Sequence, residues 1–186
     1  MPSTYRSFLT LNMDEAVVAG KVRDFFKGDV EVFVPLNAQL KDIDLVAYNL
    51  KNKKAATLQV KGSRAYEPSA MGRDFDNGSA GWFSLDKEKT EGSTADFFVF
   101  LVNVIAELER SVRRNLESHF ITVRTATFKE LCKQYKPPKP RYDFYIWVNP
   151  RSKLAFDFRD EKKKGRMWLT DYLDDRGLAQ VGKALS

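Results

Sequence analysis

Two apolar segments joined by a short polar turn constrain the fold of this chain more than any other feature. The segments are Asp42–Asn49 and Ala55–Gly62, and Leu50–Lys54 connects them. Both contain the aliphatic and β-branched residues that strands favour. A connection this short cannot run the length of a strand, so the two strands must pair antiparallel. The sequence therefore predicts a β-hairpin over residues 42–62.

The hairpin carries polar residues where a buried strand would carry apolar ones. Successive side chains of a strand point to opposite faces, so Gln59 and Lys61 share one face. On the partner strand Ile43 and Leu45 face one way and Asp44 the other, which places Asp44 with Gln59 and Lys61. Buried polar groups cost free energy unless a partner satisfies them. Two interpretations remain open: an Asp44–Lys61 ion pair that supports the hairpin, or a metal site that does chemistry.

The segment Asn12–Phe26 has the apolar spacing of a helix. Asn12 is a suitable N-cap, and Glu15 falls in the first turn, where the helix dipole favours an acid. Glu15 precedes Val18 by three residues and Val22 by seven, so it lies on the apolar face. It is either a capping-turn acid that leans into solvent or a carboxylate on a helix that packs on the polar side of the hairpin.

The rest of the chain alternates between strand-like and helical segments. Strands are predicted over Val30–Val34, Trp82–Leu85, Asp96–Asn103, His119–Val123 and Tyr142–Val148, a short helix over Thr127–Tyr135, and a helix or long insertion over Ile105–Leu116. A helical tail follows Trp168. The aromatic residues on the predicted strands are interpreted as core residues rather than as platforms for base stacking, and they are Phe97, Phe98, Phe100, Tyr145 and Trp147. This order of elements predicts an α/β fold with a mixed β-sheet flanked by helices.

Composition limits the class of protein. With 186 residues, 43% of them hydrophobic, the chain has the size of one domain. Its net charge of +6 favours an encounter with a polyanion. The lone cysteine, Cys132, is interpreted as a helix core residue, and the lone histidine, His119, argues against His-based metal sites and triads. No apolar run is long enough to span a membrane, so we expect a cytoplasmic protein.

One stretch of the chain resembles a known superfamily. The spacing "D-x14-QVK" from Asp44 to Lys61, with the preceding "VPL…DIDLVA", is similar to the PD-(D/E)XK (restriction-endonuclease-like) nucleases. It is most similar to the branch with glutamine in the third motif, which includes group I intron homing endonuclease-like proteins. The resemblance covers about residues 12–64. It implies a single domain over residues 1–186 with a restriction-endonuclease-like core, whose C-terminal half completes the sheet and adds basic loops and helices.

The resemblance implies a metal-dependent DNA endonuclease that hydrolyses phosphodiester bonds. Asp44, Gln59, Lys61 and Glu15 match the catalytic positions of the superfamily. Asp44, the Gln59 side-chain oxygen, the Val60 carbonyl and Glu15 would hold Mg²⁺ or Mn²⁺, which prefer oxygen ligands. Lys61 would hold or deprotonate the attacking water, or stabilise the charge that builds on phosphorus. One such site cuts one strand, so we expect a homodimer or a higher homo-oligomer.

The chain departs from the superfamily pattern at Ile43 and Gln59. Ile43 stands where the motif has proline, which does not coordinate metal. Gln59 is neutral, so the site has one negative charge fewer than an acidic motif and should hold metal more weakly, a loss for which Glu15 compensates. The alternative is a catalytically weakened or inactive nucleic-acid-binding module of the same fold.

Basic residues outside the motif are the candidates for DNA contacts. Contacts of lysine and arginine with phosphates add affinity that does not depend on the base sequence. A solvated charged surface is the alternative for each cluster. The candidates are Arg64, Arg73, Lys136, Lys139, Arg141, Lys163, Lys164 and Arg166.

Overall fold

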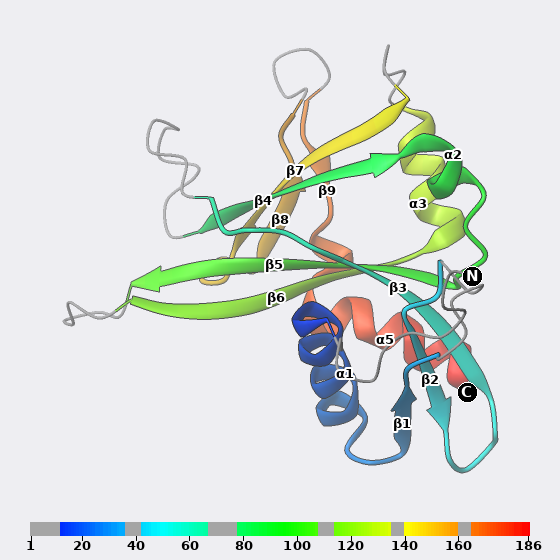
Figure 1. Ribbon diagram of the computed structural model, residues 1–186. Helices are drawn as coiled ribbons and strands as arrows, with labels where there is room; N and C mark the ends of the chain where they lie inside the picture. The colour runs from blue at the N-terminus through cyan, green and yellow to red at the C-terminus, as the bar shows by residue number, and fades with distance from the viewer. Residues whose placement is uncertain (1–11, 36–41, 67–77, 108–113, 135–139, 160–164) are drawn as a thin grey trace, which may run out of the picture.

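Two β-sheets and the helices around them form the part of the chain that the computed structural model describes, residues 12–35, 42–66, 78–107, 114–134, 140–159 and 165–186 (Figure 1). The helices are α1 (Met13–Phe26), α2 (Lys87–Glu91), α3 (Thr125–Lys133) and α5 (Asp174–Leu185), with a short 3-10 helix, η2, at Thr170–Tyr172. The strands are β1 (Val30–Phe33), β2 (Leu45–Asn49), β3 (Ala55–Gly62), β4 (Ser79–Asp86), β5 (Phe97–Glu107), β6 (Arg114–Arg124), β7 (Arg141–Asn149), β8 (Leu154–Asp157) and β9 (Met167–Trp168).

The first sheet is mixed and has the strand order β1-β2-β3-β5-β6. β2 and β3 form the predicted antiparallel hairpin, with Leu45 opposite Leu58. β3 and β5 run parallel, and β5 and β6 form a long antiparallel pair. The predicted α/β fold with a mixed sheet and flanking helices is therefore confirmed.

Helices α1 and α5 cover one face of this sheet (Figure 1). Val18 and Val22 of α1 pack with Leu58 and Val60 of β3, and Val181 of α5 joins the same apolar cluster. As predicted, Asn12 caps α1, and its side-chain oxygen accepts a hydrogen bond from the backbone nitrogen of Asp14 at 3.2 Å. Burial of these aliphatic side chains supplies the main stabilisation of the helix, at about 25 cal/mol per Å² of apolar surface.

The second sheet, with strand order β4-β7-β8-β9, covers the opposite face of the first sheet together with α3. Phe98 and Phe100 of β5 point to this side and pack with Phe83, Phe128 and Phe144. Such aromatic contacts add to the stabilisation from burial. The result is a layer of helices, then the mixed sheet, then the second sheet with α3.

One secondary-structure prediction was wrong, and one core residue was placed correctly. The expected helix or insertion over Ile105–Leu116 is not a helix in the described residues, because Ile105 belongs to β5 and Leu116 to β6, where they pair with each other. Apolar residues in this segment fit a helix or a strand equally well, and the pairing with β6 decides for the strand. Cys132 is buried in α3, as predicted.

No helix among the described residues combines the length and the apolar character needed to cross a membrane.

Candidate active site

The four catalytic candidates come from three parts of the chain that meet where β2 begins and β3 ends. Asp44 directly precedes β2, Gln59 and Lys61 lie on β3, and Glu15 lies in the first turn of α1. Asp44, Gln59 and Glu15 are buried, and Lys61 is half-buried. The structure thus places the polar residues of the predicted motif in the interior, where an unsatisfied polar group is costly.

The side chain of Asp44 accepts a hydrogen bond from β3 that a backbone carbonyl would otherwise accept where β2 begins. The backbone nitrogen of Asp44 donates to the carbonyl of Leu58 at 2.9 Å. Its side-chain Oδ2 accepts a hydrogen bond from the backbone nitrogen of Val60 at 2.8 Å. In an extended strand the N–H and C=O of one residue point to the same edge, so the carbonyl of Val60 also faces the edge that Asp44 occupies. A carboxylate and a backbone carbonyl therefore lie along one short stretch of β3.

The surroundings of Lys61 show which charges lie near it. Burial lowers the pKa of the Lys61 ammonium, while the negative charges of Asp44 and Glu15, and more weakly Asp42, raise it. The positive charge of Lys89, on α2, lowers the pKa further, and the net result is a pKa below the ordinary value for lysine. The charges of Asp44, Glu15 and Lys89 therefore all act on the Lys61 ammonium.

Helix α1 reaches this site from the face opposite to the expected one. The sequence suggested a helix packed on the side of Gln59 and Lys61. In the structure these two residues face the second sheet, because they lie beside Phe98 and Phe100 of β5. Helix α1 instead packs on the Leu58 side, because its valines need an apolar surface.

The first turn of α1 nevertheless contacts the end of β3. A Cβ on Gly62 would lie 1.8 Å from Oδ2 of Asp14, so the Asp14 carboxylate rests against the backbone of Gly62. A glycine at this position lets the strand and the helix approach closely. This close approach brings Glu15, the next residue of α1, towards Lys61.

Gln59 is connected to the segment that leads into β5. Its Oε1 accepts a long hydrogen bond, 3.4 Å, from the hydroxyl of Ser93. The carboxylate of Asp42 accepts hydrogen bonds from the backbone nitrogen of Thr94 at 2.5 Å and from its hydroxyl at 2.8 Å. Lys129 of α3 donates to the carbonyl of Ser93 at 2.9 Å. No spacing in the sequence points to Ser93, Thr94 or Lys129, since they lie far from the motif along the chain.

Burial raises the pKa of Asp42, but the hydrogen bonds from Thr94 outweigh burial and leave the pKa below its ordinary value. Asp42 is therefore ionised at neutral pH and adds a negative charge to the site. It lies just before Asp44, so both acids come from the start of the same hairpin.

The oxygen atoms of the site are of the kind that a hard divalent cation takes as ligands. The described residues contain no group of three or more histidine, cysteine, aspartate or glutamate side chains placed to hold a metal. A metal here would use the carboxylates of Asp44 and Glu15 with the neutral oxygens of Gln59 and Val60. Mg²⁺ suits such a set, because it takes oxygen ligands, needs few carboxylates and keeps several waters.

The structure describes three of the eight candidate DNA-binding residues. Arg64 is exposed just after β3, Arg141 begins β7, and Arg166 stacks its guanidinium on Phe156, 4.4 Å from the ring centroid. Arg73, Lys136, Lys139, Lys163 and Lys164 lie outside the described residues. The three arginines lie in or beside the second sheet and do not line the Asp44 site.

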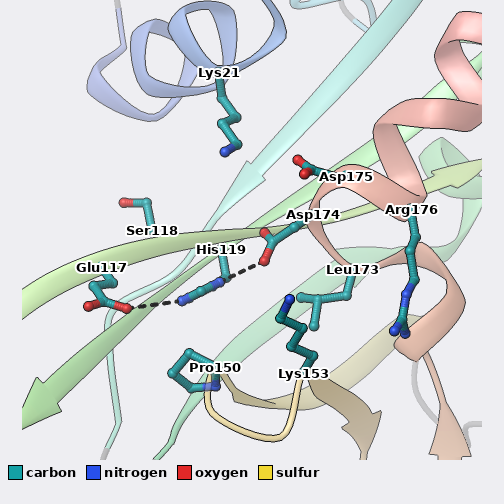
Figure 2. Close-up of a pocket in the computed structure, with 10 residues that line it drawn as sticks. All are labelled: Lys21, Glu117, Ser118, His119, Pro150, Lys153, Leu173, Asp174, Asp175 and Arg176. Atoms are coloured by element: carbon teal, nitrogen blue, oxygen red, sulfur yellow. Dashed lines mark hydrogen bonds and ion pairs between the residues drawn. The ribbon is translucent and has the colours of Figure 1, made fainter. Parts of the chain in front are cut away.

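A cavity of about 420 Å³ lies elsewhere, beside His119 (Figure 2). Nδ1 of His119 is 2.8 Å from Oδ2 of Asp174 and its Nε2 is 3.6 Å from Oε2 of Glu117. Lys21 and Lys153 also line the cavity, but none of the predicted site residues does. No spacing in the sequence links His119 to Asp174, so the sequence alone does not predict this contact.

Comparisons with known proteins identify no relative of this chain. No family model matches it, and searches of curated proteins and of solved structures return no match. The inference of function therefore starts from the side chains of the site and their chemistry.

Proposed function

We propose that the protein is a metal-dependent DNA endonuclease that hydrolyses phosphodiester bonds at the Asp44 site. The observation that carries this proposal is that buried Asp44, Gln59 and Glu15 come together with Lys61 near the end of β3, where the charges of Asp44 and Glu15 act on the Lys61 ammonium. Purely structural buried ion pairs stabilise weakly, because desolvation offsets their attraction. A cluster of this composition is better explained by chemistry on a charged substrate.

Each group has a role in the proposed reaction. Asp44 and Glu15, with the oxygens of Gln59 and Val60, would hold Mg²⁺ or Mn²⁺. When bound, such an ion polarises a phosphate and makes a coordinated water more acidic. Lys61 holds the attacking water and stabilises the negative charge that builds on phosphorus. The hydrogen bond from Val60 fixes the Asp44 carboxylate, so this group needs no reorganisation when the substrate binds.

A second candidate function is nucleic-acid binding without cleavage. The observation that favours it is the composition of the site: Gln59 adds no negative charge, and the described residues hold no group of three acidic, histidine or cysteine side chains around one point. A site with few carboxylates binds a cation weakly. The same fold would then recognise nucleic acid through its arginines.

Cleavage of supercoiled plasmid and of a large linear DNA, each with Mg²⁺, Mn²⁺ or EDTA, tests the proposal. The informative variants are Asp44→Asn and Lys61→Ala. Lys51→Ala is the matched control, because Lys51 is an exposed lysine on the β2–β3 turn that pairs with Asp29. We expect metal-dependent nicking that Asp44→Asn and Lys61→Ala abolish and that Lys51→Ala retains.

Two other results would point elsewhere. DNA binding without cleavage in any metal would support the binding module. Cleavage that persists in both Asp44→Asn and Lys61→Ala would contradict the assignment of the site. In a nuclease of this kind we also expect duplex cleavage to require two copies of the chain, one for each strand, which sedimentation of the protein with a duplex target would detect.

A further inference from the structure

The outer face of the second sheet exposes aromatic side chains. Along β4 and β7 alternate residues such as Phe83 and Phe144 point inwards, and the intervening residues point away from the core. Trp82 and Tyr145 are directly opposite each other on this outer face and are 47% and 37% exposed. Their rings are nearly parallel, with an interplanar angle of 14° and centroids 6.4 Å apart. Exposed apolar side chains that adjoin one another in a patch indicate an interaction site, whereas a single exposed one does not.

Further aromatic residues lie beside the exposed pair, on β8, just after β8 and on β9. Phe158 contacts Tyr145, with centroids 5.9 Å apart. Phe156 of β8, only 2% exposed itself and packed against buried Trp147, is opposite Trp168 of β9, and Trp168 is 54% exposed. Trp82, Tyr145, Phe156, Phe158 and Trp168 together form what we call the aromatic face. It spans all four strands of the second sheet.

Arginines border the aromatic face. The guanidinium of Arg166 stacks on Phe156. Arg141 is on the outward side of β7 and donates from Nε and Nη2 to the hydroxyl and the carbonyl of Ser84. Arg64 follows Ser63, whose hydroxyl accepts a hydrogen bond from the backbone nitrogen of Trp82 at 2.7 Å. These are the three candidate DNA-binding residues that the structure describes, and all three lie around one surface.

Two acids, Asp86 and Asp143, lie on the outward side of β4 and β7 together with Trp82 and Tyr145. They do not make this side of the sheet negative. Asp86 caps α2, where its Oδ1 accepts a hydrogen bond from the backbone nitrogen of Lys89 at 2.9 Å. Asp143 is the other acid, half-buried beside Ser84. Three arginines against two acids, one of which caps a helix, leave the surface suited to an anionic partner.

We propose that the aromatic face binds single-stranded nucleic acid by stacking unpaired bases on Trp82 and Tyr145. Every base has a π-face that stacks on an aromatic ring, and arginines bind the phosphates between the bases. A duplex hides its base faces inside the helix and cannot use such a surface. A neutral sugar polymer would stack on aromatic rings but would gain nothing from the arginines.

The aromatic face adjoins the Asp44 site through the chain itself. Ser63, which is bonded to Trp82, lies two residues after Lys61. Lys61 points between the two sheets and Trp82 points away from them, so a strand stacked on Trp82 would have to continue along residues 62–64 to bring its phosphates towards Lys61. In this respect the inference rests on the proposed nuclease function, because it assigns to that function a substrate with unpaired bases beside the scissile phosphate. The binding itself does not depend on cleavage.

Binding of fluorescently labelled oligonucleotides of about 12 nucleotides, measured by anisotropy in EDTA, tests the proposal without any cleavage. We expect the single strand to bind at least about tenfold more tightly than the corresponding duplex. Trp82→Ala and Tyr145→Ala should each weaken single-strand binding by about tenfold, the loss expected for one stacked base. Trp82→Phe keeps an aromatic ring and should lose much less. Melting temperatures confirm that the variants are folded.

Phe33→Ala is the matched control for the loss of an exposed aromatic ring. Phe33 is 52% exposed and contacts Tyr48. It lies on β1, an edge strand of the first sheet, and is not part of the second sheet. It should leave the affinity unchanged. Equal affinity of wild type and Trp82→Ala for the single strand would overturn the proposal, and so would equal affinity of the wild type for duplex and single strand.

Two further results separate this inference from its alternatives. Self-association that Trp82→Ala abolishes, in the absence of single-strand binding, would assign the face to a second copy of the chain and overturn the proposal. Single-strand binding that depends on Trp82, with no cleavage after Mg²⁺ is added, would support the aromatic face and contradict the nuclease. Cleavage that depends on Asp44 but not on Trp82 would support the nuclease and contradict the aromatic face.

Discussion

Oδ2 of Asp44 accepts a hydrogen bond from the backbone nitrogen of Val60 at 2.8 Å, inside the protein. A side chain therefore completes the β2–β3 ladder at the point where the strand β2 begins. The same carboxylate raises the pKa of Lys61. Asp44 thus bonds to the backbone of Val60, which affects stability, and acts on Lys61, which has a proposed role in catalysis. Substitutions of Asp44 can separate the effect on stability from the effect on activity.

Asp44→Ala should destabilise the protein more than Asp44→Asn. Alanine leaves the buried N–H of Val60 without its acceptor, at a cost of about 1–3 kcal/mol, whereas asparagine retains a carbonyl oxygen in the same place. Urea unfolding followed by circular dichroism measures the free energy of unfolding of each variant. Equal stability of Asp44→Ala and wild type would contradict the role of this hydrogen bond. Both variants should lack nuclease activity, because neither has the carboxylate.

Gly62→Ala should perturb the first turn of α1. The new Cβ would overlap the Asp14 carboxylate, which must rotate away at a cost of about 1 kcal/mol. Because the clash involves the end of a side chain, Asp14→Ala in the same protein should remove most of that cost. A double-mutant cycle of unfolding free energies measures this coupling. If the losses of unfolding free energy in Gly62→Ala and Asp14→Ala add up to the loss in the double variant, Asp14 does not lie against Gly62.

His119 should make stability depend on pH. Burial lowers the pKa of His119, but the hydrogen bond and the charge of Asp174, together with Glu117, outweigh burial and raise the pKa above 6.5. The imidazolium is therefore favoured in the folded state. Its contribution to stability is complete below pH 6.5 and is lost as the pH rises through the folded-state pKa.

Unfolding free energies of wild type and His119→Gln between about pH 5 and pH 9 test this expectation. The difference between the two proteins isolates His119 from the other titrating groups, and it should shrink as the pH rises. The groups that face His119 in the cavity are Asp174, Glu117, Asp175, Lys21 and Lys153, with Arg176 at the cavity wall (Figure 2). A difference that is constant across this range would show that His119 does not change its pKa on folding.

Cys132 should be unreactive in the folded protein. Burial, with a further contribution from the charge of Glu91, raises the pKa of its thiol to about 12, although Arg159 lowers it somewhat. The reactive form of a cysteine is the thiolate, which is then almost absent at pH 8. Ellman's reagent should modify the native protein slowly and the urea-unfolded protein at once. Rapid stoichiometric modification of the native protein would contradict the buried position.

Mg²⁺ should stabilise the folded protein if Asp44 and Glu15 hold it. A cation at ten times its dissociation constant adds about 1.4 kcal/mol to the free energy of unfolding. The melting temperature should therefore rise with Mg²⁺ in the wild type and rise less in Glu15→Gln. Asp29→Asn is the control, because Asp29 is an exposed acid bound to Lys51. The same rise in all three proteins would show that the ion binds elsewhere.

The sequence by itself determined the local elements and the order of side chains along them. The β2–β3 hairpin follows from two apolar segments and a short polar turn, and its period of two places Gln59 and Lys61 on one face. Asn12 and the spacing of Val18 and Val22 likewise determine the start and the apolar side of α1. These features depend on residues a few positions apart, so they can be recognised without knowledge of the fold.

Tertiary structure alone decided which faces meet. Helix α1 packs on the face of the first sheet that bears Leu58 and Val60, not on the face that bears Gln59, and the lack of a side chain at Gly62 lets its first turn lie against the end of β3. The pairing of β5 with β6 decided that Ile105 and Leu116, which the sequence allowed in a helix or a strand, lie in strands. The contact of His119 with Asp174 and the aromatic face across four strands have the same origin. Each of these contacts depends on the burial of surfaces that lie far apart in the sequence. The spacing of residues within one segment does not show which of these surfaces bury the most area against each other.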